Sequence, residues 1–139
     1  MHELIQDWLA ENGESWKKKL ASRSGLPDLR ASELLQPAVA TLCAVLRRGR
    51  LDLAAFVRGA DPASLVAMAD SHGLALRHGL DLKVAQSALS AIAPSVLDAA
   101  RRAVRTEEGV QRMLESGATA NQVGAIGELA NRLYRQRAT

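Results

Sequence analysis

The stretch from Leu74 to Val104 places apolar residues at helical spacing and interrupts them with one glycine and one proline. Gly79 is expected to end one helix and Pro94 to begin another, because glycine favours a left-handed C-terminal cap and proline suits a first helical turn. No segment alternates apolar and polar residues for long enough to predict a strand. This punctuated helical pattern favours an all-α fold.

The composition supports the same fold class. Apolar residues make up 47% of the 139 residues, but aromatic residues make up only 3%. The core must therefore consist of Ala, Leu, Val and Ile, and small or unbranched side chains lose little entropy in helices, whereas sheets favour β-branched and aromatic ones. We predict a single domain over residues 1–139, a compact multi-helix bundle of about seven to nine short helices.

A looser copy of the pattern occupies the first half of the chain. Residues 20–48 align with residues 74–102, and each copy has a Leu-Ala pair, a Gly-Leu pair, a proline and a final Arg-Arg pair. One explanation is an internal duplication into two related helix-Gly-helix-Pro-helix halves, and the other is the shared composition of Ala-Leu-rich helices. Two copies are too few for a solenoid, so both explanations predict a compact bundle.

Glycine, proline and capping residues predict the helix boundaries. Asn12-Gly13 is expected to end the first helix, Pro37 to begin a separate or kinked segment that runs to Arg48, and Pro94 to begin a new helix. Asp61-Pro62 has the residues of an N-cap and a first helical turn, and the helix that follows is expected to stop at Gly73.

Further boundaries are expected at Gly25, as a left-handed cap, at Thr106, as a helix start, and at Gly117, as a stop. The segment Thr119–Gln122 matches a capping box. It predicts a last helix with one apolar side, formed by Val123, Ile126, Leu129, Ala130 and Leu133, and an outer side with Arg132, Arg135 and Arg137.

Residues suited to catalysis or metal binding are few. Cys43 is the only cysteine, which excludes an internal disulfide and a cysteine-based zinc site, and its apolar neighbours predict a buried, inert thiol. His72 and His78 lack the spacing of a helical metal pair. The sequence contains no P-loop, no G-x-G-x-x-G motif and no nucleophile elbow. We therefore expect no enzymatic activity, no metal and no cofactor.

The charge and the apolar pattern indicate in which compartment of the cell the protein is expected. Eighteen Lys and Arg against fifteen Asp and Glu give a net charge of +3, which permits an acidic partner without requiring one. The first residues are acidic and lack the apolar core of a signal peptide. The longest apolar run, from Pro37 to Leu46, is far shorter than the roughly 20 residues that span a bilayer. We expect a cytoplasmic protein that does not enter a membrane.

Residues 74–90 have the pattern of a helix-turn-helix unit, which needs a small residue in its first helix, a glycine turn and apolar locking residues. Gly79 supplies the turn, and the other positions are filled by Ala75, Leu80, Ala85 and Ala88. Any two helices joined at a glycine give a similar pattern. The second helix offers side chains that can contact bases and phosphates, namely Lys83, Gln86, Ser87 and Ser90.

Two other groups of residues are candidates for a surface. Arg101, Arg102 and Arg105 can form one basic face with the arginines of the last predicted helix, or they can simply complement a helix dipole. Trp8 and Trp16 are separated by the predicted break at Gly13, so they are expected to hold the first two helices together. Exposure of both tryptophans would instead indicate a patch that binds a protein partner.

The phrases LASRSGLPDLRASELLQPAVATLCAVLRR and LALRHGLDLKVAQSALSAIAPSVLDAARR resemble the small bacterial YidB-like helical proteins. These carry a Leu-Ala-x-x-x-Gly-Leu start, a polar helix with Gln or Ser, and an Ala-Leu-Pro-rich helix. The resemblance covers roughly the middle two-thirds of the chain. It implies an all-helical bacterial cytosolic domain and supplies no active site, because the family has no known function.

These observations together predict a non-enzymatic helical interaction protein that binds another protein or forms a homo-oligomer. The alternative is a DNA-binding protein that uses the unit at 74–90. In either case the surface to test consists of Lys83, Gln86, Ser87, Ser90, Arg101, Arg102 and Arg105.

Overall fold

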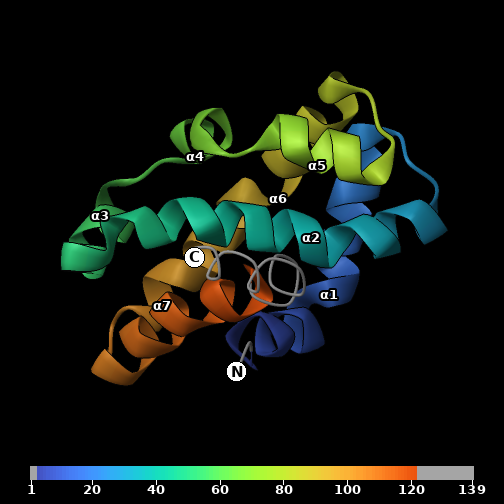
Figure 1. Cartoon of the computed structure of the whole chain (residues 1–139). Coiled ribbons are helices and arrows are strands. Elements are labelled where there is room, and N and C mark those ends of the chain that lie inside the picture. Colours follow the sequence, from blue (N-terminus) through green and yellow to red (C-terminus); the bar gives the residue numbers. More distant parts are fainter. Residues whose placement is uncertain (1–2, 122–139) are drawn as a thin grey trace, which may run out of the picture.

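The computed structural model describes residues 3–121, and all regular structure within this range is helical (Figure 1). In chain order the elements are α1 (Glu3–Ser24), α2 (Asp28–Leu46), the 3-10 helix η1 (Arg47–Asp52), α3 (Leu53–Gly59), α4 (Pro62–Met68), α5 (Ser71–His78), α6 (Leu82–Ala103) and α7 (Glu107–Asn121). The prediction of an all-α helical bundle is confirmed for the described residues.

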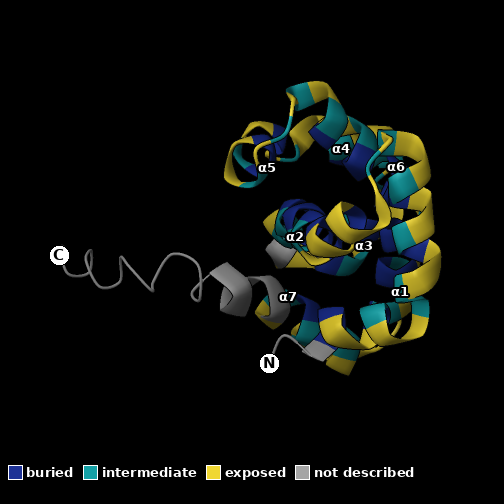
Figure 2. Cartoon of the chain, turned by 90° about the vertical axis from the view of Figure 1, so that its right-hand side faces the viewer, coloured by how far each residue is buried: buried dark blue, intermediate teal, exposed yellow. Residues whose placement is uncertain are grey.

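Two long helices, α2 and α6, form the centre of the bundle. In Figures 1 and 2, α4 and α5 lie above α2 and α7 lies below it. The helix α6 packs against α1, α2, α4 and α5, and its buried residues are Ala, Leu, Ile and Val. The contribution of α6 to the core therefore consists of the small and aliphatic side chains that the composition predicts.

The expected helix end at Asn12-Gly13 is wrong, because α1 continues through both residues. The Asn12 side-chain amide donates to the Trp8 carbonyl oxygen at 3.1 Å, inside the same helix. Trp8 and Trp16 consequently lie on one side of a single helix, where both are buried. A glycine inside a helix costs only about 1 kcal/mol, and burial of two tryptophans outweighs that cost.

The expected restarts at Pro37 and Pro94 are also wrong, because each proline lies inside a long helix. A proline in a helix interior costs about 3 kcal/mol. Each helix buries ten residues, which lie on both sides of its proline, so breaking either helix would expose part of the core. Pro94 is exposed and Pro37 is half-buried, and their rings therefore displace little core packing.

Three of the predicted helix boundaries, at Gly25, Asp61 and Gly79, agree with the structure. Gly25 and Gly79 both end helices in the left-handed conformation, with φ of 76° and 62°. The Asp61 carboxylate accepts from the Ser64 backbone N–H at 2.8 Å at the start of α4. These expectations are confirmed because a cap depends on residues within one turn of it.

Gly73 does not end a helix, contrary to expectation. The helix α4 ends at Met68, and Asp70 begins α5 by accepting a hydrogen bond from the Gly73 backbone N–H at 2.9 Å. Gly73 therefore lies in the first turn of α5. Its backbone N–H is one of the donors that a helix start leaves unpaired, and the Asp70 carboxylate accepts from it.

The start of α7 agrees with expectation, since the Thr106 hydroxyl accepts from the Gly109 backbone N–H at 3.0 Å. The expected stop at Gly117 is wrong, because α7 runs on to Asn121. Thr119 thus lies inside α7 rather than at a cap. The predicted last helix, 123–133, lies outside the described residues.

The two aligned segments, 20–48 and 74–102, share a left-handed glycine followed by a long helix that contains a proline. The helices before that glycine differ greatly, since α1 has 22 residues and α5 has 8. The similarity of the two segments is therefore partial. An internal duplication stays a prediction.

Candidate functional site

The unit at 74–90 has the expected connection between its two helices. The helix α5 ends at Gly79, and α6 begins three residues later at Leu82. Ala75, Ala85 and Ala88 are buried, so the three alanines lie where locking residues are needed. The two helices pack against each other. This geometry is typical of a helix-turn-helix, and also of any tight pair of core helices.

The polar residues of this unit form a narrow stripe on α6. Lys83 and Gln86 are exposed, whereas Ser87 and Ser90 are half-buried. The stripe is narrow because α6 is surrounded by α1, α2, α4 and α5. Recognition of bases in a major groove requires a helix that protrudes from the protein, whereas the start of α6 turns Ala85, Ala88 and Leu89 into the core.

The arginines at the end of α6 are far from this stripe. Lys83 and Arg102 are separated by 19 positions of the same helix, which corresponds to about 28 Å, and Arg105 lies beyond the end of that helix. Arg102 and Arg105 are exposed and Arg101 is half-buried. The structure therefore does not bring the seven predicted site residues together. The proposed continuation of the basic face, through Arg132, Arg135 and Arg137, lies outside the described residues.

Arg101 has a structural role. Its guanidinium donates to the carbonyl oxygen of Ala60 at 2.6 Å, across 41 positions of sequence. Ala60 connects α3 to α4, where a carbonyl group needs a donor that the helices do not supply. Arg101 thus fixes the α3–α4 connection against α6 rather than presenting its charge to a partner.

We expect Arg101→Met to lower the free energy of unfolding by about 2 kcal/mol, because the Ala60 carbonyl loses a charged hydrogen-bond donor. Arg105→Met is the matched control, since Arg105 is exposed just beyond the end of the same helix, and its effect should stay within about 0.5 kcal/mol. Urea unfolding followed by circular dichroism measures both. Equal effects of the two changes would contradict the structural role of Arg101.

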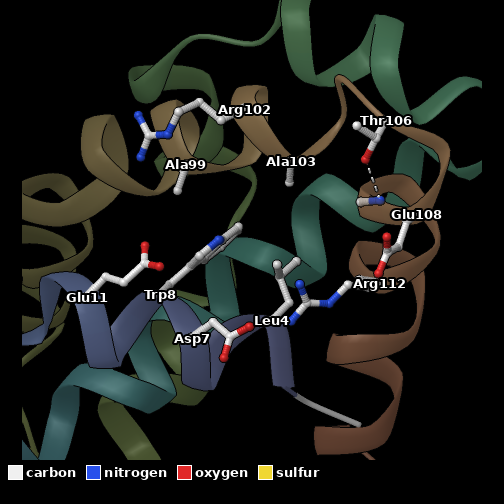
Figure 3. Close-up of a pocket in the computed structure, with 11 residues that line it drawn as sticks. Leu4, Asp7, Trp8, Glu11, Ala99, Arg102, Ala103, Thr106, Glu108 and Arg112 are labelled. Atoms are coloured by element: carbon white, nitrogen blue, oxygen red, sulfur yellow. Dashed lines mark hydrogen bonds and ion pairs between the residues drawn. The ribbon is translucent and has the colours of Figure 1, made fainter.

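A hollow of about 320 Å³ lies between α1, the end of α6 and the start of α7 (Figure 3). Trp8, Ala99 and Ala103 line its apolar part. Arg112 crosses from α7 to Asp7 on α1 and donates to its carboxylate at 2.6 Å. This ion pair joins the first and last described helices of the bundle.

The other charged residues around this hollow have mixed signs. Glu11 and Glu108 bring negative charge, and Arg102 brings positive charge. With the Asp7–Arg112 pair, the lining carries three carboxylates and two guanidinium groups, a formal net charge of only −1, so the hollow has no strong field that would select an anion or a cation. We assign it a structural role, as the place where α7 joins α1 and α6.

A second hollow, of about 340 Å³, lies between α3 and α4 and is mostly apolar. Leu65 is buried at its base, and Met68 has 40% of its surface exposed. We call this site the α3–α4 hollow and define it by Ala55, Phe56, Gly59, Ala60, Ser64, Leu65 and Met68. It combines the only phenylalanine of the chain with a flexible methionine at an open surface.

The sequence does not reveal the α3–α4 hollow. Met68 follows Leu65 at helical spacing, which is the usual pattern of a buried stripe. However, α4 has only seven residues and packs against α2 and α6 with Leu65 turned inward, so Met68 lies at the margin of the contact. A helix of two turns can bury one apolar position fully and leave the next one partly open.

The Cys43 thiol is not activated as a nucleophile. Burial raises the pKa of the Cys43 thiol to about 12, although the nearby Arg47 guanidinium lowers it, so the thiol is protonated at neutral pH. A protonated, fully buried thiol is a poor nucleophile. Among residues 3–115, whose side chains the structure describes apart from Glu3 and Arg50, no group of three His, Cys, Asp or Glu side chains can hold a metal ion.

Within the part of the chain that the structure describes, one helical segment, Asp28–Gly49, is long and apolar enough to cross a membrane, and 56% of its apolar window is buried inside the bundle. Such burial is typical of a core helix. Comparison of the chain with protein-family models, with curated proteins and with solved structures finds no match.

Proposed function

We propose that this protein is a non-enzymatic interaction module that binds another protein, or a second copy of itself, through the α3–α4 hollow. The observation that carries the proposal is the partly exposed Met68 beside Phe56 at the edge of an open apolar hollow. Methionine is flexible and polarizable, so it adapts to the shape of an inserted side chain. An apolar hollow of this kind suits the anchor residue of a partner.

The size of the hollow limits its contribution to the free energy of binding. Full burial of one Leu, Met or Phe side chain contributes about 1.5–3 kcal/mol. That is enough for one anchor, and the remaining affinity must come from the surface around it. Leu51, fully exposed on the neighbouring η1, is an apolar residue that a larger interface can use. An interaction of modest affinity fits best with the burial of one anchor side chain and one further apolar contact.

The tryptophans do not contribute to this surface. Trp8 and Trp16 are buried in the core, so the patch that their exposure would have created is not formed. The interaction function is therefore supported by the α3–α4 hollow and not by the tryptophans of α1. A bacterial cytoplasmic location and the YidB-like resemblance stay predictions of the sequence.

DNA binding through α5 and α6 is the second candidate. The left-handed Gly79 and the exposed Lys83 and Gln86 favour it, and the exposed Arg77 on α5 can add a phosphate contact. The exposed Asp81 at the start of α6 opposes it, because a carboxylate there repels phosphate. The protein-binding function rests on a more continuous surface.

We expect Met68→Lys to weaken the interaction by about 30-fold, equivalent to about 2 kcal/mol, because it places a charge in the apolar anchor site. A photo-reactive amino acid at position 68, introduced in cells, first identifies the partner by the mass of the cross-linked product. Affinity is then measured by sedimentation or by calorimetry. Ala67→Lys is the matched control, because Ala67 is exposed on the same helix and lies outside the hollow.

Two results would contradict the proposal. One is equal cross-linking from positions 67 and 68, and the other is a strictly monomeric protein with no cross-linked partner. A gel-shift titration with duplex DNA at two salt concentrations tests the second candidate. DNA binding should weaken steeply as salt rises and should be lost in Lys83→Glu, and no shift at low salt would exclude it.

A further inference from the structure

Leu51 is the most exposed large apolar side chain that the structure describes, with 100% of its surface accessible. It lies on η1, two residues before Leu53, which is buried at the start of α3. Residues two positions apart on a helical turn do not share a side, so the burial of Leu53 directs Leu51 outward. A single exposed leucine is common on protein surfaces, and the significance of Leu51 comes from the hollow that lies beside it.

The α3–α4 hollow and η1 are neighbours. Phe56, which lines the hollow, packs so closely on Gly49 of η1 that a β-carbon at Gly49 would overlap the Phe56 side chain. An outward-pointing leucine and an open apolar hollow therefore occupy adjoining elements. A surface that carries a projecting group next to a recess can pair with a copy of itself about a two-fold axis, because each copy then fills the recess of the other.

We propose that the occupant of the α3–α4 hollow is Leu51 of a second copy of this chain, inserted reciprocally in a two-fold dimer. This inference rests on the proposed function of the hollow and names its partner. The hollow has a volume of about 340 Å³, and an apolar cavity of about 150 Å³ already accommodates benzene, so a leucine side chain fits. Met68 is flexible and can close around the inserted side chain.

The charges beside the two contact elements are complementary. Asp52 follows Leu51 directly and is exposed. Arg58 precedes Gly59 of the hollow lining, is exposed, and forms no ion pair with a described side chain. Insertion of Leu51 places Asp52 and the partner's Arg58 at the margin of the same contact, where opposite charges favour pairing. In a two-fold dimer this pairing occurs twice.

Asp61 also borders the hollow, next to Ala60, and its charge has the same sign as that of Asp52. Its carboxylate accepts hydrogen bonds from the Ser64 backbone N–H at 2.8 Å and the Ser64 hydroxyl at 3.2 Å, at the start of α4. The positive end of the helix dipole offsets part of the Asp61 charge there. Arg58 is therefore the group at this margin that is open to a charged partner.

Sedimentation equilibrium of the full chain, at up to about 1 mM, tests the proposal, because a contact built on two leucines is small and its dimer weak. We expect the average mass to rise with concentration from 14.9 kDa toward twice that value. Leu51→Asp should weaken the association at least about tenfold, since it brings a carboxylate to an apolar hollow. Leu76→Asp is the matched control and should change nothing, because Leu76 is 85% exposed on α5 and lies outside the hollow.

A mixture of two variants tests both sides of the contact. Leu51→Asp loses the inserted side chain and keeps the hollow, whereas Met68→Lys keeps the inserted side chain and alters the hollow. In the mixed dimer one contact is intact, and the other joins two substituted positions of opposite charge. We expect the equimolar mixture to associate at least about tenfold more tightly than either variant alone, and no gain on mixing would overturn the proposal.

The results separate this inference from the proposed function. A chain that stays monomeric at about 1 mM would overturn the dimer, but the function of the hollow would stand if the photo-reactive residue at position 68 captures a different protein. A dimer that Leu76→Asp weakens and Leu51→Asp does not would also overturn the inference. Equal cross-linking from positions 67 and 68 would instead contradict the proposed function itself, whatever the mass of the protein.

Discussion

Gly109→Ala is expected to lower the free energy of unfolding by about 2–3 kcal/mol, which is typical of overpacking in a core. A β-carbon at Gly109 would overlap the backbone carbonyl oxygen of Ala103, at the end of α6. Backbone atoms at a helix end cannot rotate away as a flexible side chain can. The helix α7 must therefore move away from α6, which loosens the contacts of the fully buried Met113.

Gly13→Ala is the control for this prediction. Gly13 lies inside α1, and an added β-carbon there meets no atom within 4 Å. This change should raise the free energy of unfolding by about 0.5–1 kcal/mol, because alanine loses less backbone entropy in a helix than glycine. Urea unfolding of both variants gives opposite signs if the packing is as described. A stabilising effect of Gly109→Ala would show that α7 does not approach α6 so closely.

The features of the fold that the sequence predicts correctly are local ones. Asp61, Gly25 and Gly79 act through hydrogen bonds or backbone conformations within one turn, so the local sequence carries the signal for these boundaries. The glycine signal alone is not sufficient, since Gly13, Gly73 and Gly117 lie inside helices. The helical period of the apolar residues is equally local. Fold class and these helix ends could therefore be predicted without knowledge of tertiary contacts.

The features that could not be predicted depend on contacts between distant residues. Pro37 and Pro94 are strong local breaking signals, but each lies in a helix whose buried residues continue on both sides. The cost of about 3 kcal/mol for each proline is offset by burial against other helices, which no local pattern reveals. The continuation of α1 past Gly13 has the same cause.

The same distinction applies to the candidate site. The sequence identifies Arg101 as a surface cation, but its partner is the Ala60 carbonyl group, 41 positions away. Met68 belongs to a pattern typical of buried residues, yet the packing of the short α4 leaves it partly open. Residue type indicates which interactions a side chain can make. Only the fold decides whether the side chain makes them within the protein, as Arg101 does, or leaves them open to a partner, as Met68 does.

Trp16→Ala is expected to have the largest effect in the chain, a loss of about 4 kcal/mol in the free energy of unfolding. Trp16 retains 3% of its surface exposed, on the side of α1 that packs against α2 and α6. Removal of the indole leaves a cavity in a core that consists mostly of small and aliphatic side chains. Trp16→Phe preserves part of the volume and should cost markedly less.

The contact between the two indoles can be measured separately. The ring centroids of Trp8 and Trp16 are 6.3 Å apart with an angle of 67° between the planes, which is an edge-to-face arrangement. A double-mutant cycle with Trp8→Leu and Trp16→Leu should give a coupling of about 1 kcal/mol, as such aromatic pairs do. Since both residues lie on one continuous helix, the coupling should persist under all conditions that leave α1 folded. A coupling near zero would mean that each ring is held by α6 and α2 alone, and the aromatic pair would then contribute nothing beyond its burial.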